Sequence, residues 1–180
     1  MRGMFFRGAV GAVLVLAGTG VASAQVTVNL PDTSQTTTLT ATVQDQARVT
    51  TPANVTFTVN DVTAATSGSN AAVTVTNIVL PTATDKLKIS VQANAASFTP
   101  PVALATTWSA SDVSWTGGTW TNATAAPGTL SDSAYGEVAR CDANVTACNS
   151  ANVAFSLAAK PTVQRSGNHT LTITWKFEKL

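Results

Sequence analysis

Histidine and cysteine are nearly absent from this chain, which has one histidine and two cysteines among 180 residues. His169, Cys141 and Cys148 are too few to make a four-ligand zinc site from Cys and His alone. No G-x-S-x-G turn presents a nucleophile, and no D-x-D-x-D loop is present to bind calcium. We therefore expect no catalytic residue, no metal site and no cofactor, and we expect that the protein is not an enzyme.

Charged residues are also scarce, at 11% of the chain. Without Arg2 and Arg7, eight basic residues stand against nine acidic ones, so the net charge is −1 with histidine neutral. The chain has no run of basic residues, which argues against nucleic acid or an anionic membrane surface as a partner. The carboxylates are scattered singly, and nothing selects a pair of them for glycoside hydrolysis.

Long apolar runs are missing except near the start of the chain. Arg2 and Arg7 precede an uncharged stretch, residues 8–21, and Ala22-Ser23-Ala24 follows as a small-x-small cleavage site. The apolar centre, residues 9–17, is shorter than the roughly 20 residues that a membrane span needs. We therefore interpret residues 1–24 as a cleaved secretion signal and expect a secreted or cell-envelope protein with no membrane span after cleavage.

Threonine and valine are abundant, and they alternate. Period-two alternation is typical of strands with one buried face, and it recurs in Val26–Leu30, Leu39–Val43, Val55–Val59, Val73–Leu80, Leu87–Ala93, Val153–Leu157 and Leu171–Phe177. Turn residues separate these runs, and no segment has a clear helical period. The pattern predicts an all-β fold, an antiparallel Ig-like β-sandwich formed by residues 37–180. Residues 25–36 are expected to be a flexible arm or an edge strand, and residues 98–150, where alternation weakens, an elaborated long connection.

The two cysteines, Cys141 and Cys148, are expected to form a disulfide, because export leads to an oxidising compartment. A loop this short gives about 2.5 kcal/mol in the chain-entropy model. We expect the disulfide to pin a hairpin or loop, in preference to a redox or metal-binding role.

Three of the four tryptophans, Trp108, Trp115 and Trp120, fall in the same stretch. The Gly117-Gly118 pair predicts a tight hairpin in which Trp115 faces Trp120 and the two indoles touch. Either this pair closes one end of the core, which is the commoner use of such pairs, or it is exposed together with Trp108 as a binding surface.

Near the C-terminus, the last alternating run reads His169-Thr170-Leu171-Thr172-Ile173-Thr174-Trp175-Lys176-Phe177. This ending resembles the closing motif of WxL-type bacterial surface domains, Tyr-x-x-x-[Leu/Ile/Val]-Thr-Trp-x-Leu. Ile173, Thr174 and Trp175 match that motif, while His169 stands where Tyr is usual and Phe177 where Leu is usual. Leu87-x-Ile89 stands where the family has its Trp-x-Leu signature. The resemblance implies a β-sandwich attached non-covalently to peptidoglycan.

Three functions remain open at this point. The first is a non-enzymatic cell-envelope protein, a binding or structural module whose partners are cell-wall polysaccharide or other surface proteins. The second is a subunit of a fimbria-like or coat fibre, which would self-associate through an edge strand, with the arm from residue 25 to 38 as the candidate segment. The third is a carbohydrate-binding module that uses the Trp115/Trp120 hairpin.

Overall fold

A computed structural model describes residues 26–31 and 35–180, so the predicted signal, residues 1–24, lies outside the described residues. The chain divides into two units, residues 1–41 and residues 42–180. The described residues of the first unit contain no strand, and all except Val28 are exposed. Within the described ranges, no helix is both long and apolar enough to cross a membrane.

The second unit is all-β and contains twelve strands among its residues. These are β1 (Gln46–Thr50), β2 (Thr66–Ser67), β3 (Val73–Val79), β4 (Leu87–Ala93), β5 (Val113–Thr116), β6 (Trp120–Thr121), β7 (Ala123–Ala125), β8 (Gly128–Thr129), β9 (Gly136–Cys141), β10 (Ala147–Ser150), β11 (Ala154–Leu157) and β12 (Ile173–Lys179). A single 3-10 turn, Ala110–Asp112, precedes β5.

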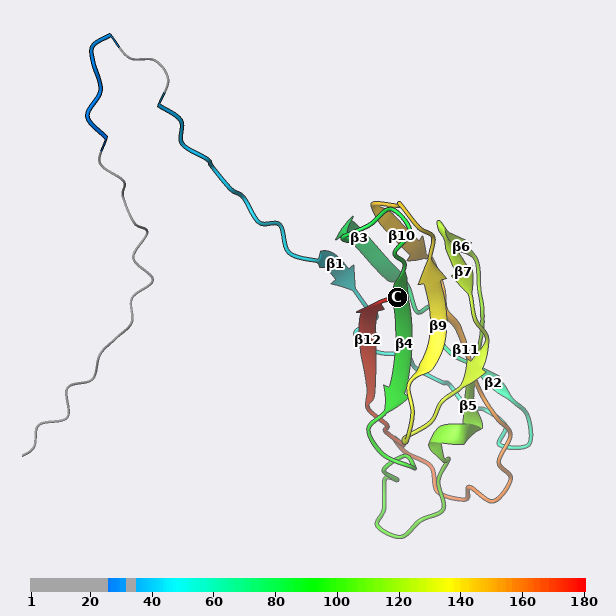
Figure 1. The fold of residues 1–180 in the computed structure, drawn as a ribbon. Coiled ribbons are helices and arrows are strands. Elements are labelled where there is room, and N and C mark those ends of the chain that lie inside the picture. Colours follow the sequence, from blue (N-terminus) through cyan, green and yellow to red (C-terminus); the bar gives the residue numbers. More distant parts are fainter. Residues whose placement is uncertain (1–25, 32–34) are drawn as a thin grey trace, which may run out of the picture. The chain divides into compact units, whose positions relative to one another are not determined.

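The strands form three antiparallel four-stranded sheets (Figure 1). Their orders are β1-β3-β10-β6, β2-β11-β5-β8 and β12-β4-β9-β7. The longest continuous pairing joins β12 to β4, from Ile173 opposite Ala93 to Lys179 opposite Leu87. β12, β2 and β1 therefore each lie at the end of a sheet.

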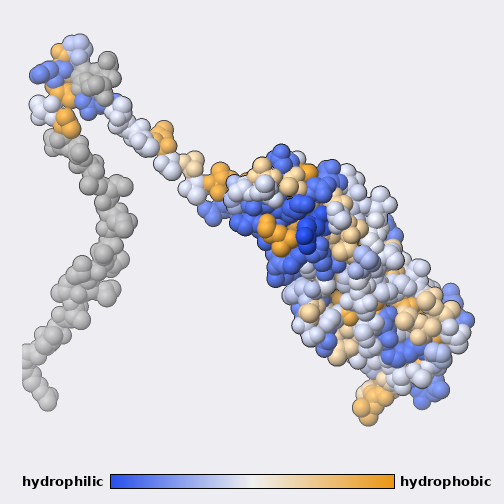
Figure 2. Space-filling model, turned by 45° about the vertical axis from the view of Figure 1, so that its right-hand side comes forward, coloured by the Kyte–Doolittle hydropathy of each residue, from blue (hydrophilic) through white to orange (hydrophobic). Residues whose placement is uncertain are grey.

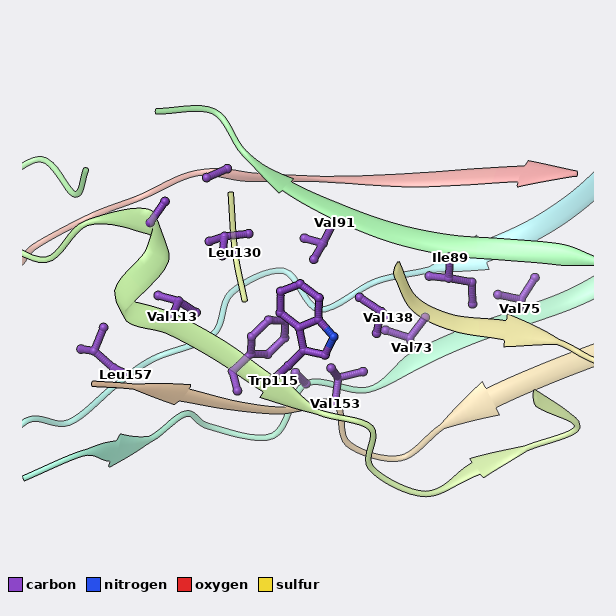
Figure 3. Packing of buried hydrophobic residues seen from close by; sticks show 14 of the residues in the cluster. Val73, Val75, Ile89, Val91, Val113, Trp115, Leu130, Val138, Val153 and Leu157 are labelled. Atoms are coloured by element: carbon purple, nitrogen blue, oxygen red, sulfur yellow. The ribbon is translucent and has the colours of Figure 1, made fainter. Parts of the chain in front are cut away.

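The core lies between β4 on one side and β5 and β11 on the other, with Trp115 at its centre (Figure 3). Val73, Ile89 and Val91 have no exposed area, and Trp115 is 2% exposed. In β3 and β4 the alternating apolar residues are buried, and Ser90 of β4 is buried as well. Period-two alternation thus gives each strand one apolar face, and these faces meet in the core.

Three of the alternating runs do not form the expected strands. Residues 26–30 and 39–43 carry no strand, and within residues 55–59 only Phe57 forms an isolated bridge, to Gly68. Leu39 is 91% exposed and Val43 is 70% exposed. Alternation gives a segment two different faces but does not supply a neighbouring strand. Among the described residues, 26–30 and 39–43 have no such neighbour, and residues 55–59 have only the short contact with residues 68–69.

The prediction that residues 98–150 form a long connection is wrong. This stretch contains the six strands from β5 to β10, and it supplies Trp115, Val138 and both cysteines to the core. The strands were missed because they are short and rich in Gly, Ala and Ser, so the alternation of apolar and polar residues is weak. At Gly128 and Gly136 no side chain fits, because the Trp115 ring occupies the space beside them.

The predicted disulfide between Cys141 and Cys148 is confirmed. Cys141 ends β9 and Cys148 lies in β10, and these strands belong to different sheets. Both residues are almost fully buried, at 1% and 0% exposed. The disulfide therefore links two sheets through the core, where the sequence predicted only a pinned hairpin or loop.

Candidate functional site

One hollow in the second unit is a groove of about 910 Å³. It lies between the segment 51–62, the segment 163–171 and the start of β12. Its apolar lining comes from these segments and from the open side of the core, namely Val55, Phe57, Val59, Val62, Phe98, Trp108, Val113, Leu130, Phe155, Leu157, Val163, Leu171, Ile173 and Trp175. Arg165 is the one formally charged residue among the lining residues. A groove of this size and composition suits an apolar ligand or an extended peptide.

The groove is open because the sheets end there. β12 pairs with β4 along one edge, and within residues 26–31 and 35–180 no strand pairs with its other edge. The facing sheet ends at the two-residue strand β2. An unpaired edge presents a row of backbone N–H and C=O groups that can pair with another strand.

The matching residues of the closing motif lie on this edge strand. Ile173, Trp175 and Phe177 are half-buried and point toward the core, whereas Thr174 is exposed and its hydroxyl donates to Asn94 Oδ1 at 2.7 Å. The ring of Trp175 meets Phe155 edge-on, with the ring centres 6.4 Å apart. The apolar face of β12 thus has the predicted alternation, but it is only half covered.

Apolar residues on the face drawn in Figure 2 are scattered. The face drawn there is mostly pale or blue, and the orange, most apolar residues form small groups. Several of the most exposed large apolar side chains instead belong to the N-terminal part of the chain, including Val26, Leu30, Leu39 and Val43.

His169 lies at one end of the groove, and both of its ring nitrogens are occupied. Nε2 lies 3.1 Å from the Arg165 carbonyl oxygen, which can only accept, so Nε2 carries the proton. In the neutral ring, Nδ1 then accepts the Thr107 hydroxyl at 2.7 Å. The imidazole also meets the Trp108 indole edge-on, with centres 5.2 Å apart. His169 is therefore a hydrogen-bonded part of the groove lining.

A polar cluster holds the opposite wall of the groove in place. The Asp112 carboxylate accepts from Lys160 Nζ at 2.6 Å and from the Ser109 backbone N–H at 2.7 Å. The backbone N–H of the same Lys160 donates to the carbonyl of Val62 at 2.7 Å. Asp112 thus holds Lys160, whose backbone binds Val62 at the end of the segment 51–62, and no sequence motif indicated this role.

The hydrogen bonds of Asp112 predict that the free energy of unfolding decreases at low pH. Burial of the carboxylate by itself raises its pKa, but the hydrogen bonds from Lys160 and Ser109 outweigh this and hold the pKa below its usual value. A lowered folded-state pKa stabilises the fold above the unfolded pKa of about 3.9, and this contribution is lost as the pH falls through the folded value. We expect Asp112→Asn to cost about 1 kcal/mol at neutral pH.

Urea unfolding at neutral pH and below the carboxylate pKa measures this effect. The stability difference between Asp112→Asn and the parent should shrink as the pH falls, because both side chains are then uncharged. A difference that stayed constant with pH would show that the carboxylate charge contributes nothing.

The predicted tryptophan hairpin is wrong. Trp115 pairs with Phe155 and Gly128, and Trp120 pairs with Ser150 in a different sheet. Gly118 takes a positive φ of 62° where the chain passes from one sheet to the other, and a Cβ there would lie 2.4 Å from the Asn152 carbonyl oxygen. The Gly-Gly pair therefore makes a crossing between sheets in place of a two-residue turn.

The three tryptophans do not form an exposed binding surface. Trp108 is 5% exposed and Trp115 is 2% exposed, while Trp120 is half-buried. Each indole N–H donates to a backbone carbonyl, of Ala158, Ala126 and Gly117 respectively, at 2.8–3.0 Å. Burial with satisfied N–H groups corresponds to the core interpretation of these residues.

Within residues 26–31 and 35–180, no cluster of three or more His, Cys, Asp or Glu side chains could hold a metal ion. Comparison of the chain with protein-family models, with curated proteins and with solved structures found no match. The groove beside β12 is therefore the feature on which a functional argument can be built.

Proposed function

We propose that this chain is a non-enzymatic, exported protein of the bacterial cell envelope, a structural module that accepts an extended strand from another polypeptide. Its sheets would form an Ig-like sandwich that lacks one edge strand. The observation that carries this proposal is the apolar groove of about 910 Å³ that the start of β12 lines, beside an edge with no pairing strand among the described residues. Strand addition to an open edge uses backbone hydrogen bonds for affinity and pockets for alternate side chains for specificity.

Three features of the groove favour a strand over a small molecule. Leu171 and, within β12, Ile173 and Trp175 line the groove at every second position, which matches the spacing of side chains on an incoming strand. The backbone edge beside it has no pairing strand among the described residues. The lining has almost no charge, so the incoming segment should be uncharged and apolar on one face.

A synthetic peptide tests strand acceptance. The full chain is refolded with a labelled peptide that is as long as β12 and alternates valine and threonine. Fluorescence anisotropy should then show saturable binding. A control peptide of the same composition, with all its valines adjacent, should bind at least about tenfold more weakly, since it lacks the period of two. Equal binding of both peptides, or binding of neither, would contradict the proposal.

Export and attachment to the wall form a separate part of the proposal. They are supported by the signal-like start of the chain and by the resemblance of residues 169–177 to the WxL closing motif. N-terminal sequencing of the protein from expressing cells should begin at Gln25, and the protein should co-sediment with purified peptidoglycan. Failure to sediment would remove wall binding but leave the groove proposal intact.

A further inference from the structure

We infer that the strand taken up by the groove is residues 36–43 of a second copy of this chain, so that copies join head to tail. This inference rests on the proposed function and names the partner. Residues 36–43 read Thr-Thr-Thr-Leu-Thr-Ala-Thr-Val, with no charge and no proline. All eight residues are exposed and outside any strand.

The composition of this segment fits the groove. Leu39, Ala41 and Val43 occupy every second position, and the positions between them are threonines, which favour extended backbone. As a strand, the segment would place three apolar side chains on one face and a row of hydroxyls on the other. The apolar face would cover the half-buried side chains of β12, and the threonines would face water. Residues 26–30 alternate as well, but that run is shorter and ends at Pro31.

Geometry explains why the segment comes from another copy. Asp45 lies beside the last residue of β12, with its Oδ2 3.2 Å from Lys179 Nζ. An antiparallel strand would place Val43 near the opposite end of β12, roughly 20 Å away. Two residues of chain span only about 7 Å, so the segment cannot reach that position in its own groove. Every strand pair between named strands in the second unit is antiparallel, and antiparallel pairing is slightly the more stable arrangement.

One donor segment and one acceptor groove per chain make a heterologous contact. Such a contact repeats from copy to copy and produces an open filament unless the rotation closes a ring. The expected assembly is therefore a series of oligomers without a fixed size, and its length should increase with protein concentration.

Complementary variants test the inference. Leu39→Asp with Val43→Asp disables the donor face, and Ile173→Lys disables the groove. The proteins are refolded from denaturant, alone or mixed, and examined by sedimentation velocity. We expect the parent chain to form an oligomer series and each variant to remain a monomer. The mixture should form a dimer containing one copy of each variant, because one still donates and the other still accepts.

One further variant serves as a control, and another replaces the groove variant if that variant does not fold. Thr38→Asp with Thr42→Asp adds the same charges at the same spacing to the outward face of the segment, and it should assemble like the parent chain. Val59→Lys on the opposite wall replaces Ile173→Lys if the latter does not fold, as judged by circular dichroism.

Several results would overturn the inference. The first is a parent chain that stays monomeric at every concentration, as it would if the arm inserted into its own groove. The second is assembly of the Leu39/Val43 variant, and the third is a mixture that forms no dimer. The fourth is loss of assembly in the Thr38/Thr42 variant. If the alternating peptide still binds in any of these cases, the proposed function stands and only the identity of the partner is wrong.

Discussion

Replacing Trp115 with alanine is expected to lower the free energy of unfolding by about 3–5 kcal/mol, the usual cost of removing a large aromatic side chain from a core. The indole is 2% exposed and lies between the sheets, where it contacts the Phe155 ring at 6.2 Å between centres. Its N–H donates to the Ala126 carbonyl at 2.8 Å, so the change also leaves a buried acceptor without its donor. Urea unfolding of the full chain measures this loss.

Trp120→Ala is the matched control for this prediction. Trp120 is half-buried and its N–H bonds to Gly117, three residues away, so its removal opens little of the core. We expect a loss of about 1 kcal/mol, typical of a partly exposed position. Equal losses for the two variants would mean that Trp115 is not the centre of the core.

Gly128→Ala is expected to destabilise the protein by about 2–3 kcal/mol through overpacking. Gly128 lies in β8 directly opposite Trp115, and a Cβ there would come within 2.4 Å of Cζ2 of the indole. The backbone of an edge strand and a buried ring cannot separate without opening the core. Gly136 covers the same ring, with a Cβ position 2.6 Å from Cη2, so Gly136→Ala should behave similarly.

A double-mutant cycle tests the cause of this loss. Trp115→Phe removes the part of the indole that meets Gly128, so Gly128→Ala should cost at least about 1 kcal/mol less in that background than in the parent. If Gly128→Ala cost the same in both backgrounds, the glycine would be required for some reason other than the ring.

The sequence predicted those parts of the fold in which alternation and pairing agree. β3, β4 and β12 were expected from alternating apolar residues, and the disulfide was expected from export and spacing. These predictions succeeded because a period of two assigns one face of a strand to the core whatever the strand pairs with. The pairing itself, with β12 beside β4, depends on contacts between residues far apart in the chain.

The Trp115–Trp120 hairpin and the connection at residues 98–150 failed for a related reason. Gly117-Gly118 is compatible with a tight turn, but it is equally compatible with a crossing between sheets, and tertiary pairing decided between them. Short strands made of Gly, Ala and Ser carry little periodic signal. At Gly128 and Gly136 the lack of a side chain is explained by the neighbouring ring of Trp115, which local sequence does not reveal.

The groove could be anticipated only in part. Val55, Phe57 and Val59 alternate as a strand would, and Leu171, Ile173 and Trp175 were expected to be buried. The two sets line one open groove because no strand lies between them among the residues that the structure describes. The sequence of a segment does not show whether a neighbouring strand is missing. The alternation of residues 36–43, which are exposed and outside any strand, is one signal of a strand without a partner.

Amide hydrogen exchange along β12 is the most direct measurement of the claim that this edge accepts a strand. Every second amide of β12 points away from β4 and is unpaired if the groove is empty. In the assembled parent chain, these amides between Ile173 and Lys179 should exchange much more slowly than in the monomeric Leu39→Asp/Val43→Asp variant. The amides that face β4 should be slow in both proteins. Equally fast exchange of the outward amides in the assembled chain would contradict the claim.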